Sequence, residues 1–220
     1  MLSTLSALAA GWVAVGVEQA GRAGAGLAAG VALRRLAAPP PWYLPHALQD
    51  GAPGGVLGWL GLALAGTALL LAVALLVSGL IGIFRSGGWL RSLALSLLLI
   101  SLVWVPTSLA AAAMPGGGGP VAELYGALGS PRAGRWTALV LGGLLLWLLS
   151  GFAARRAVAV GRAWMRADAR PFRRRLVRVV AGYPVAISVI LITIAQAWMS
   201  PATAVAWGLL LFGTLVYRTA

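Results

Sequence analysis

The chain has 220 residues, of which 60% are hydrophobic and only 10% are charged, with a net charge of +13. A soluble domain is about half apolar and about a quarter charged, so this composition indicates an integral membrane protein. Cysteine is absent, which excludes disulfides, thiol catalysis and iron–sulfur ligation. All 17 basic residues are arginine, a pattern typical of a GC-rich bacterial genome.

Six segments contain the roughly 20 mostly apolar residues that a helix needs to cross the hydrocarbon core. They are predicted at 3–33, 56–84, 89–113, 135–154, 178–199 and 202–217. Pro131 and Pro201 each follow a serine, and serine followed by proline marks the start of a helix. The last two segments are therefore expected to form a tight hairpin. Pro106 and Pro184 are expected to kink their helices.

Arginine placement predicts the orientation of these segments. The basic loop at 154–178 carries nine arginines and one aspartate, and the positive-inside rule places it in the cytoplasm. Both termini are then cytoplasmic, with twelve arginines on that side and four on the other. The predicted fold is a single all-α domain over 1–220, a multi-pass bundle of about six spans in a bacterial inner membrane. A Gly-rich non-cytoplasmic loop is predicted at 114–134, with a short surface helix in "PVAELYGALG".

The basic loop has two interpretations. The simpler one is a topology determinant. The other is an interfacial amphipathic helix, stopped by Pro171, that attracts anionic lipid headgroups. Membrane lipids are the expected partners in either case. The arginines concerned are Arg155, Arg156, Arg162, Arg166, Arg170, Arg173, Arg174, Arg175 and Arg178. Nucleic acid is not an expected partner, because no aromatic stacking platform accompanies the charge.

Glu18 and Arg22 stand in the middle of the first apolar segment, with Gln19 beside them. A spacing of four residues places the two charges on one helix face, in the order that favours an ion pair. Each charge alone at mid-membrane costs about 2.5–3.5 kcal/mol, so the pair is expected to face the bundle interior. The pattern "GLAAG" at 26–30 predicts close helix approach nearby. The pair is either a structural lock or a functional polar site.

Three short stretches resemble site-2-protease-like membrane zinc metallopeptidases, whose early span carries H-E-x-G-H-A. Residues 18–23 read "EQAGRA", residues 64–69 read "LAGTAL" where the family has an "LAGP" helix, and residues 111–119 read "AAAMPGGGG" where the family has "N-x-x-P". Glu18 replaces the first His, Gln19 the general base and Arg22 the second His. Arginine stays protonated and glutamine is not a base, so the resemblance implies a pseudoenzyme that keeps a helical core without hydrolysis.

His46, the only histidine, is expected in a loop between the first two spans. A single histidine can ligate a haem or chlorophyll axially, so His46 is a candidate cofactor ligand, and a plain surface residue is the alternative. No metal site is expected, because His46, Asp50 and Glu123 are too few ligands. No other cofactor is expected beyond bound lipid. Several tryptophans near span ends are expected to form an aromatic belt: Trp42, Trp59, Trp89, Trp136 and Trp198.

The function predicted from these observations is non-catalytic. The chain lacks a complete acid/base set, so we expect a structural, assembly or scaffolding subunit of a larger membrane complex, in contact with other integral membrane subunits. The alternative is a small transporter or channel subunit whose polar site includes Glu18 and Arg22. That alternative predicts polar residues from several spans converging at mid-depth.

Overall fold

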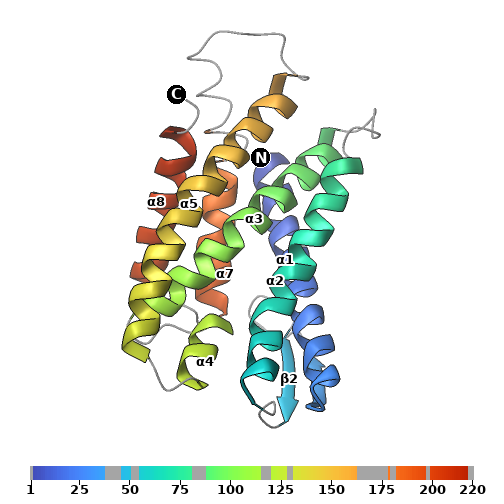
Figure 1. Ribbon diagram of the computed structural model, residues 1–220. Helices are drawn as coiled ribbons and strands as arrows, with labels where there is room; N and C mark the ends of the chain where they lie inside the picture. Colours follow the sequence, from blue (N-terminus) through green and yellow to red (C-terminus); the bar gives the residue numbers. More distant parts are fainter. Residues whose placement is uncertain are drawn as a thin grey trace.

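The computed structural model describes residues 2–37, 46–50, 55–80, 88–114, 120–127, 131–162, 178, 182–196 and 199–217. These residues form a helical bundle with one short β-ribbon (Figure 1). The elements are α1 (Leu2–Ala28), β1 (Ala32–Ala37), β2 (His46–Asp50), α2 (Gly55–Leu80), α3 (Gly88–Ala113), α4 (Pro120–Ala127), α5 (Pro131–Arg162), α7 (Tyr183–Ala195) and α8 (Pro201–Tyr217).

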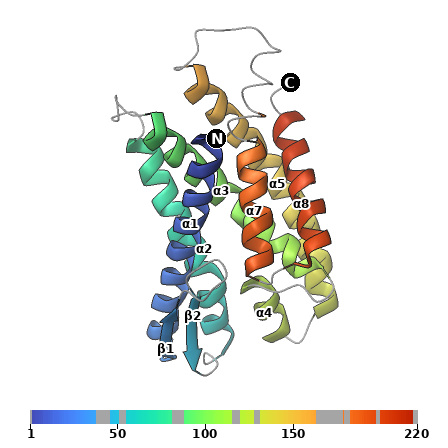
Figure 2. The same ribbon diagram turned by 180° about the vertical axis from the view of Figure 1, so that it is seen from behind.

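Helix α3 is the central element of the bundle. It contacts α1 and α2 on one side and α5 and α7 on the other, and it crosses the bundle obliquely between these groups (Figures 1 and 2). Its apolar segment Trp89–Ala113 is 83% buried, against 24% for Leu60–Val77 of α2 and 39% for Ala133–Arg155 of α5. The hydrophobic core is therefore built around α3.

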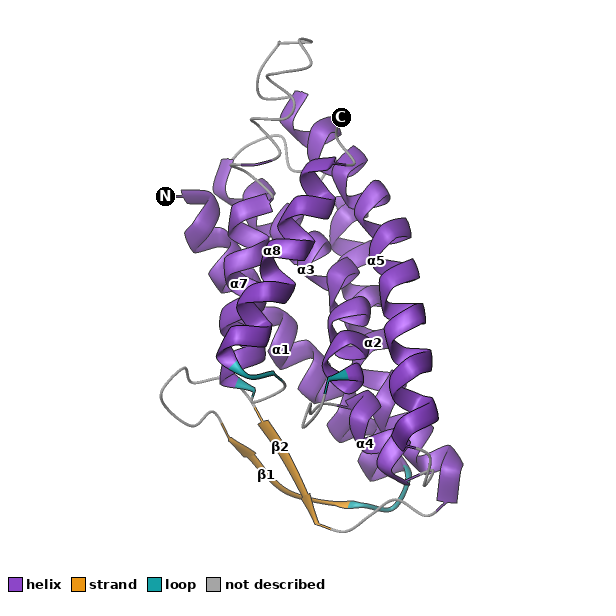
Figure 3. Cartoon of the chain, turned by 90° about the vertical axis from the view of Figure 1, so that its left-hand side faces the viewer, coloured by secondary structure: helices purple, strands orange, loops and turns teal. Residues whose placement is uncertain are grey.

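The two ends of the molecule carry different elements. Both chain termini lie at one end, where α5 also ends (Figure 1). The antiparallel β1–β2 ribbon and α4 lie at the other end (Figure 3). Termini at a common end are what an even number of membrane crossings requires.

Three helices among the described residues are long and apolar enough to cross a membrane, namely α2, α3 and α5. Helices α7 and α8 are apolar but shorter. Helix α1 is long enough, but Glu18, Gln19 and Arg22 lower its apolarity. Large apolar side chains are exposed on the outer faces, among them Leu57, Leu64, Leu75, Leu76, Trp136, Val140, Leu148, Leu209 and Leu210. So large an exposed apolar surface indicates a membrane-embedded protein, and the predicted helical bundle is confirmed in this coarse form.

The predicted extent of the first span, 3–33, is wrong at its end. Helix α1 ends at Ala28, and the Val31 N–H donates to the Gly26 carbonyl (2.8 Å) while the Gly30 N–H donates to the Leu27 carbonyl (3.1 Å). These two bonds form a Schellman motif, which needs a left-handed residue, and Gly30 has φ 76°. The glycine at the end of "GLAAG" therefore stops the helix instead of packing against a neighbour.

The short helix predicted in "PVAELYGALG" is confirmed as α4, and the basic segment at 154–178 begins as helix, because α5 continues to Arg162. Two further predictions are corrected by the structure. Pro184 stands in the first turn of α7, where its missing N–H has no cost, so it does not kink the helix. His46 begins strand β2, opposite Ala37 of β1, instead of lying in a loop.

The predicted helix starts are confirmed. Pro131 and Pro201 are the first residues of α5 and α8. At α8 the Thr203 N–H donates to Ser200 Oγ (3.3 Å), which is the geometry of a serine N-cap. The hairpin of α7 and α8 is also confirmed, since the two helices pack side by side and the rings of Tyr183 and Phe212 stack with centroids 4.4 Å apart.

Candidate functional site

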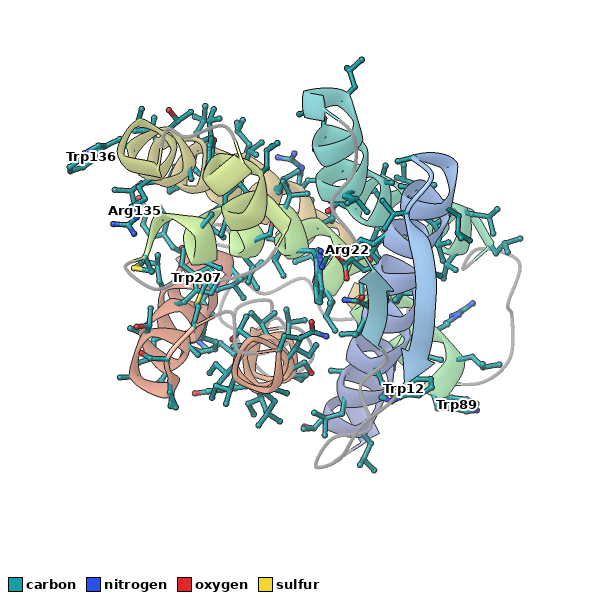
Figure 4. The ribbon with its side chains drawn as sticks, turned by 90° about the horizontal axis from the view of Figure 1, so that it is seen from below. Trp12, Arg22, Trp89, Arg135, Trp136 and Trp207 are labelled. Atoms are coloured by element: carbon teal, nitrogen blue, oxygen red, sulfur yellow. The ribbon has the colours of Figure 1, made fainter. Side chains whose placement is uncertain are left out.

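The polar turn of α1 lies inside the bundle. Glu18 is 1% exposed and Gln19 is 3% exposed, and the Gln19 amide Nε2 donates to Glu18 Oε2 (2.9 Å). Arg22 is partly buried, and it lies near the centre of the molecule when seen from the end that carries the β-ribbon (Figure 4). The structure therefore brings together the three residues singled out from the sequence, within one turn of one helix.

A close helix crossing positions this turn. At Gly21 an added Cβ would lie 2.7 Å from the Gly66 Cα and 2.8 Å from the Ala65 carbonyl oxygen of α2. Real Cβ atoms do not approach other atoms so closely, so only glycine fits at this point. Helices α1 and α2 are in backbone contact here because neither crossing residue carries a side chain.

Gly66 makes the room that the polar side chains occupy. A Cβ there would lie 2.5 Å from the Glu18 carbonyl oxygen, 3.0 Å from Arg22 Cγ and 3.1 Å from Glu18 Cγ. Glu18 and Arg22 therefore leave α1 on the same face, toward α2. The sequence pattern "LAGTAL" contains Gly66, but its role beside the polar turn was missed because contacts between helices are not visible in a single sequence.

Five hydroxyls in the helix interiors bond within their own helices, while Ser92 Oγ and Ser188 Oγ are buried with no hydrogen-bond partner among the described residues. Ser101 Oγ donates to the Leu97 carbonyl (2.7 Å) and Thr193 Oγ1 donates to the Val189 carbonyl (2.8 Å). The same kind of bond is made by Thr107, Ser108 and Ser150. Such bonds satisfy the hydroxyl locally, so these five residues provide no convergent polar site.

One buried hydrogen bond joins two helices through a hydroxyl. The Trp207 Nε1–H of α8 donates to Thr107 Oγ1 of α3 (3.1 Å), and the same hydroxyl donates to the Val103 carbonyl (2.6 Å). It lies beside Pro106, whose carbonyl oxygen would be 3.5 Å from a Cβ at Gly142 of α5. Helices α3, α5 and α8 are thus held together near the proline of the central helix.

The remaining predicted site residues belong to elements other than α1 or lie outside the described part of the chain. His46 is in the β-ribbon, and its side chain is not described. Arg155 and Arg178 are exposed, and Arg156 and Arg162 belong to α5. Arg166, Arg170, Arg173, Arg174 and Arg175 lie outside the described residues, as do Trp42 and Trp198 of the expected aromatic belt. Trp89 and Trp136 are exposed, each near the start of its helix.

Metal chemistry does not fit the polar turn. Among the described residues there is no group of three or more His, Cys, Asp or Glu side chains that can hold a metal ion. Arg22, which stands where the protease pattern has its second histidine, has no lone pair for zinc. Gln19, in the position of the general base, accepts no proton. The turn can hold a carboxylate and a guanidinium between packed helices.

Comparison with protein-family models, with curated proteins and with solved structures finds no match for this chain. The resemblance to the zinc metallopeptidases therefore stays a prediction from residues 18–23, 64–69 and 111–119, of which 115–119 lie outside the described part.

Proposed function

We propose that this protein is a non-catalytic packing subunit of a larger membrane complex. The observation that carries the proposal is the bonding of five interior hydroxyls. Those of Ser101, Thr107 and Thr193, for example, donate to backbone carbonyls of their own helices. Such bonds fit a packed interior, and they leave these hydroxyls no donor for a solute. The exposed apolar faces of α2, α5 and α8 supply surface for lipid or for other membrane subunits.

The finer parts of the proposal concern the membrane. The helices are proposed to make about six crossings of a bacterial inner membrane, with both termini in the cytoplasm. The end with both termini and Arg155 would face the cytoplasm, in agreement with the positive-inside rule. The crossing of α1 and α2 is proposed to derive from a protease-like core that has lost its zinc ligands.

The deciding experiment is purification from native membranes in mild detergent, followed by mass spectrometry of the accompanying proteins. A packing subunit is expected to retain an integral membrane partner at a fixed ratio, and a tag on that partner should recover this chain in return. A lone, stable monomer that conducts a solute in vesicles would overturn the proposal.

The buried polar turn favours a second candidate, a transporter or channel subunit. Glu18 and Gln19 are almost wholly buried, and ionisable groups at such depth often mark a substrate path. This candidate predicts that purified protein in vesicles supports solute flux, and that Glu18→Gln abolishes the flux while the protein stays folded. Equal solute flux from the wild type and the Glu18→Gln variant would rule out this transporter or channel candidate.

A further inference from the structure

The far end of α5 continues beyond its apolar segment. The segment that can cross a membrane ends at Arg155, and the helix runs on to Arg162. Seven further residues at 1.5 Å per residue add about 10 Å of helix. The headgroup layer is ~5–7 Å deep on each side of the hydrocarbon core, so the last two turns of α5 extend through it.

Arginines stand on this helical extension at a spacing that places them on one side. Arg155 is exposed, while the preceding Ala153 and Ala154 are buried against the core. Arg162 follows seven residues later, almost two full turns, so it occupies the same side of α5 as Arg155. Val158 packs partly against the core, which fixes the extension to the bundle.

The charge on α5 is not offset from within the helix. Residues 131–162 contain no aspartate or glutamate, and Arg155 and Arg156 are adjacent. Because the helix already holds these residues in place, a phosphate group that contacts them orders less of the chain than it would on a flexible loop. A topology signal needs only charge during insertion, whereas this arrangement keeps the charge at headgroup depth in the folded protein.

We propose that the last two turns of α5 form a binding surface for anionic phospholipid headgroups, with Arg155 and Arg162 as the contacting residues. The proposal rests on the membrane placement argued above and is independent of the assembly role. One arginine near an anionic surface changes the association constant for anionic lipid about fivefold.

Arg135 provides a matched control, because it is also exposed and belongs to the same helix, near its opposite end. The full chain is reconstituted in phosphatidylcholine vesicles, and association of spin-labelled phosphatidylglycerol is measured against spin-labelled phosphatidylcholine. Wild type is expected to prefer phosphatidylglycerol. Arg155→Gln should lower that preference about fivefold and Arg155→Gln/Arg162→Gln further. Arg135→Gln removes an exposed arginine outside the proposed surface and should lower the preference by less than Arg155→Gln does. Arg155→Lys/Arg162→Lys should keep most of the wild-type preference.

The proposal is overturned if the double glutamine variant keeps the wild-type preference, or if Arg135→Gln lowers it equally. Displacement of the lipid by inorganic phosphate at matched ionic strength would also overturn it, since the surface would then bind the free anion. If wild type does not enter vesicles at all, the membrane placement itself fails, and this outcome is distinct from a lost lipid preference.

Discussion

Glu18 and Arg22 leave α1 beside Gly66 of α2, and a side chain at Gly66 would occupy the space that their Cγ atoms need. Burying a charged residue in an apolar bundle requires a partner and room for both. Gln19 supplies one donor to the Glu18 carboxylate, and the paired glycines Gly21 and Gly66 supply the room. The geometry of this turn therefore depends on Gly21 and Gly66, two residues without side chains.

We expect Gly66→Ala to destabilise the protein by about 1–3 kcal/mol, because the new methyl group meets the Glu18 backbone and must push α1 away from α2. Gly61→Ala is the matched control: it lies on the same helix, with no atom within 4 Å of the added Cβ. Its expected effect is neutral or slightly stabilising, because alanine is the better helix former. Thermal unfolding in detergent measures both, and equal midpoints would contradict the close crossing.

Glu18→Gln and Arg22→Gln are each expected to lower stability by about 1–3 kcal/mol, since either change leaves a charge in the interior without its counter-charge. The double variant should be destabilised by less than the sum of the two. Unfolding by denaturant in mixed micelles gives the three values. Additive effects would show that the two side chains do not interact.

At the scale of elements, α3 organises the bundle through apolar packing and a single proline. Pro106 removes one backbone donor from the middle of the helix. The hydroxyl of Thr107 then bonds both the Val103 carbonyl and the indole of Trp207, and Gly142 of α5 lets the proline turn approach closely. This contact joins the central helix to α5 and α8.

The hydrogen bond between Trp207 and Thr107 is expected to be weak but measurable. In membranes, such bonds average about 0.6 kcal/mol by double-mutant cycles and reach about 1.7 kcal/mol. We expect a coupling energy in this range from Trp207→Phe, Thr107→Val and the double variant, measured by unfolding in detergent. Zero coupling would mean that the bond is absent in the folded protein.

The N-cap of α8 is a second testable detail. Ser200→Ala removes the oxygen that accepts the Thr203 N–H and is expected to cost about 1 kcal/mol. Ser200→Asp keeps an acceptor at the cap and should retain most of the stability. Thermal midpoints of the two variants test this difference, and an alanine variant as stable as wild type would be inconsistent with the cap.

At the scale of the whole molecule, the two ends differ in composition and in what they present to water. One end has both termini and the last turns of α5, and the other has the β-ribbon, α4 and the first turns of α5 (Figures 1 and 3). Between them, exposed leucine, valine and tryptophan side chains cover the outer helix faces. This distribution predicts an orientation in the membrane.

The absence of cysteine makes the orientation directly measurable. Ala133→Cys places a thiol at an exposed position near the end with the β-ribbon, and Tyr217→Cys places one near the end with the termini. A membrane-impermeant maleimide added to spheroplasts is expected to label the cysteine at 133 at once and that at 217 only after lysis. The reverse pattern would invert the orientation, and equal labelling would rule out a spanning topology between them.

Composition alone predicted the helical class, and local signals predicted several helix starts. Apolar runs identify helices because every backbone group in lipid must be bonded within its own segment, and Ser200-Pro201 marks a start because capping involves only neighbouring residues. Local patterns gave wrong predictions at two positions. The end of α1 was placed too late because the turn motif at Gly30 was not recognised, and a kink was predicted at Pro184 because the start of α7 was not known.

The sequence by itself determined that Glu18, Gln19 and Arg22 share one turn of a helix, because helical spacing is a local property. Only the tertiary structure decided what that turn faces. The crossing of Gly21 and Gly66, the bond from Trp207 to Thr107 and the central place of α3 depend on how apolar helices pack, and many arrangements bury the same apolar area. Shape complementarity between distant residues selects among them, and it is not encoded in any single stretch of chain.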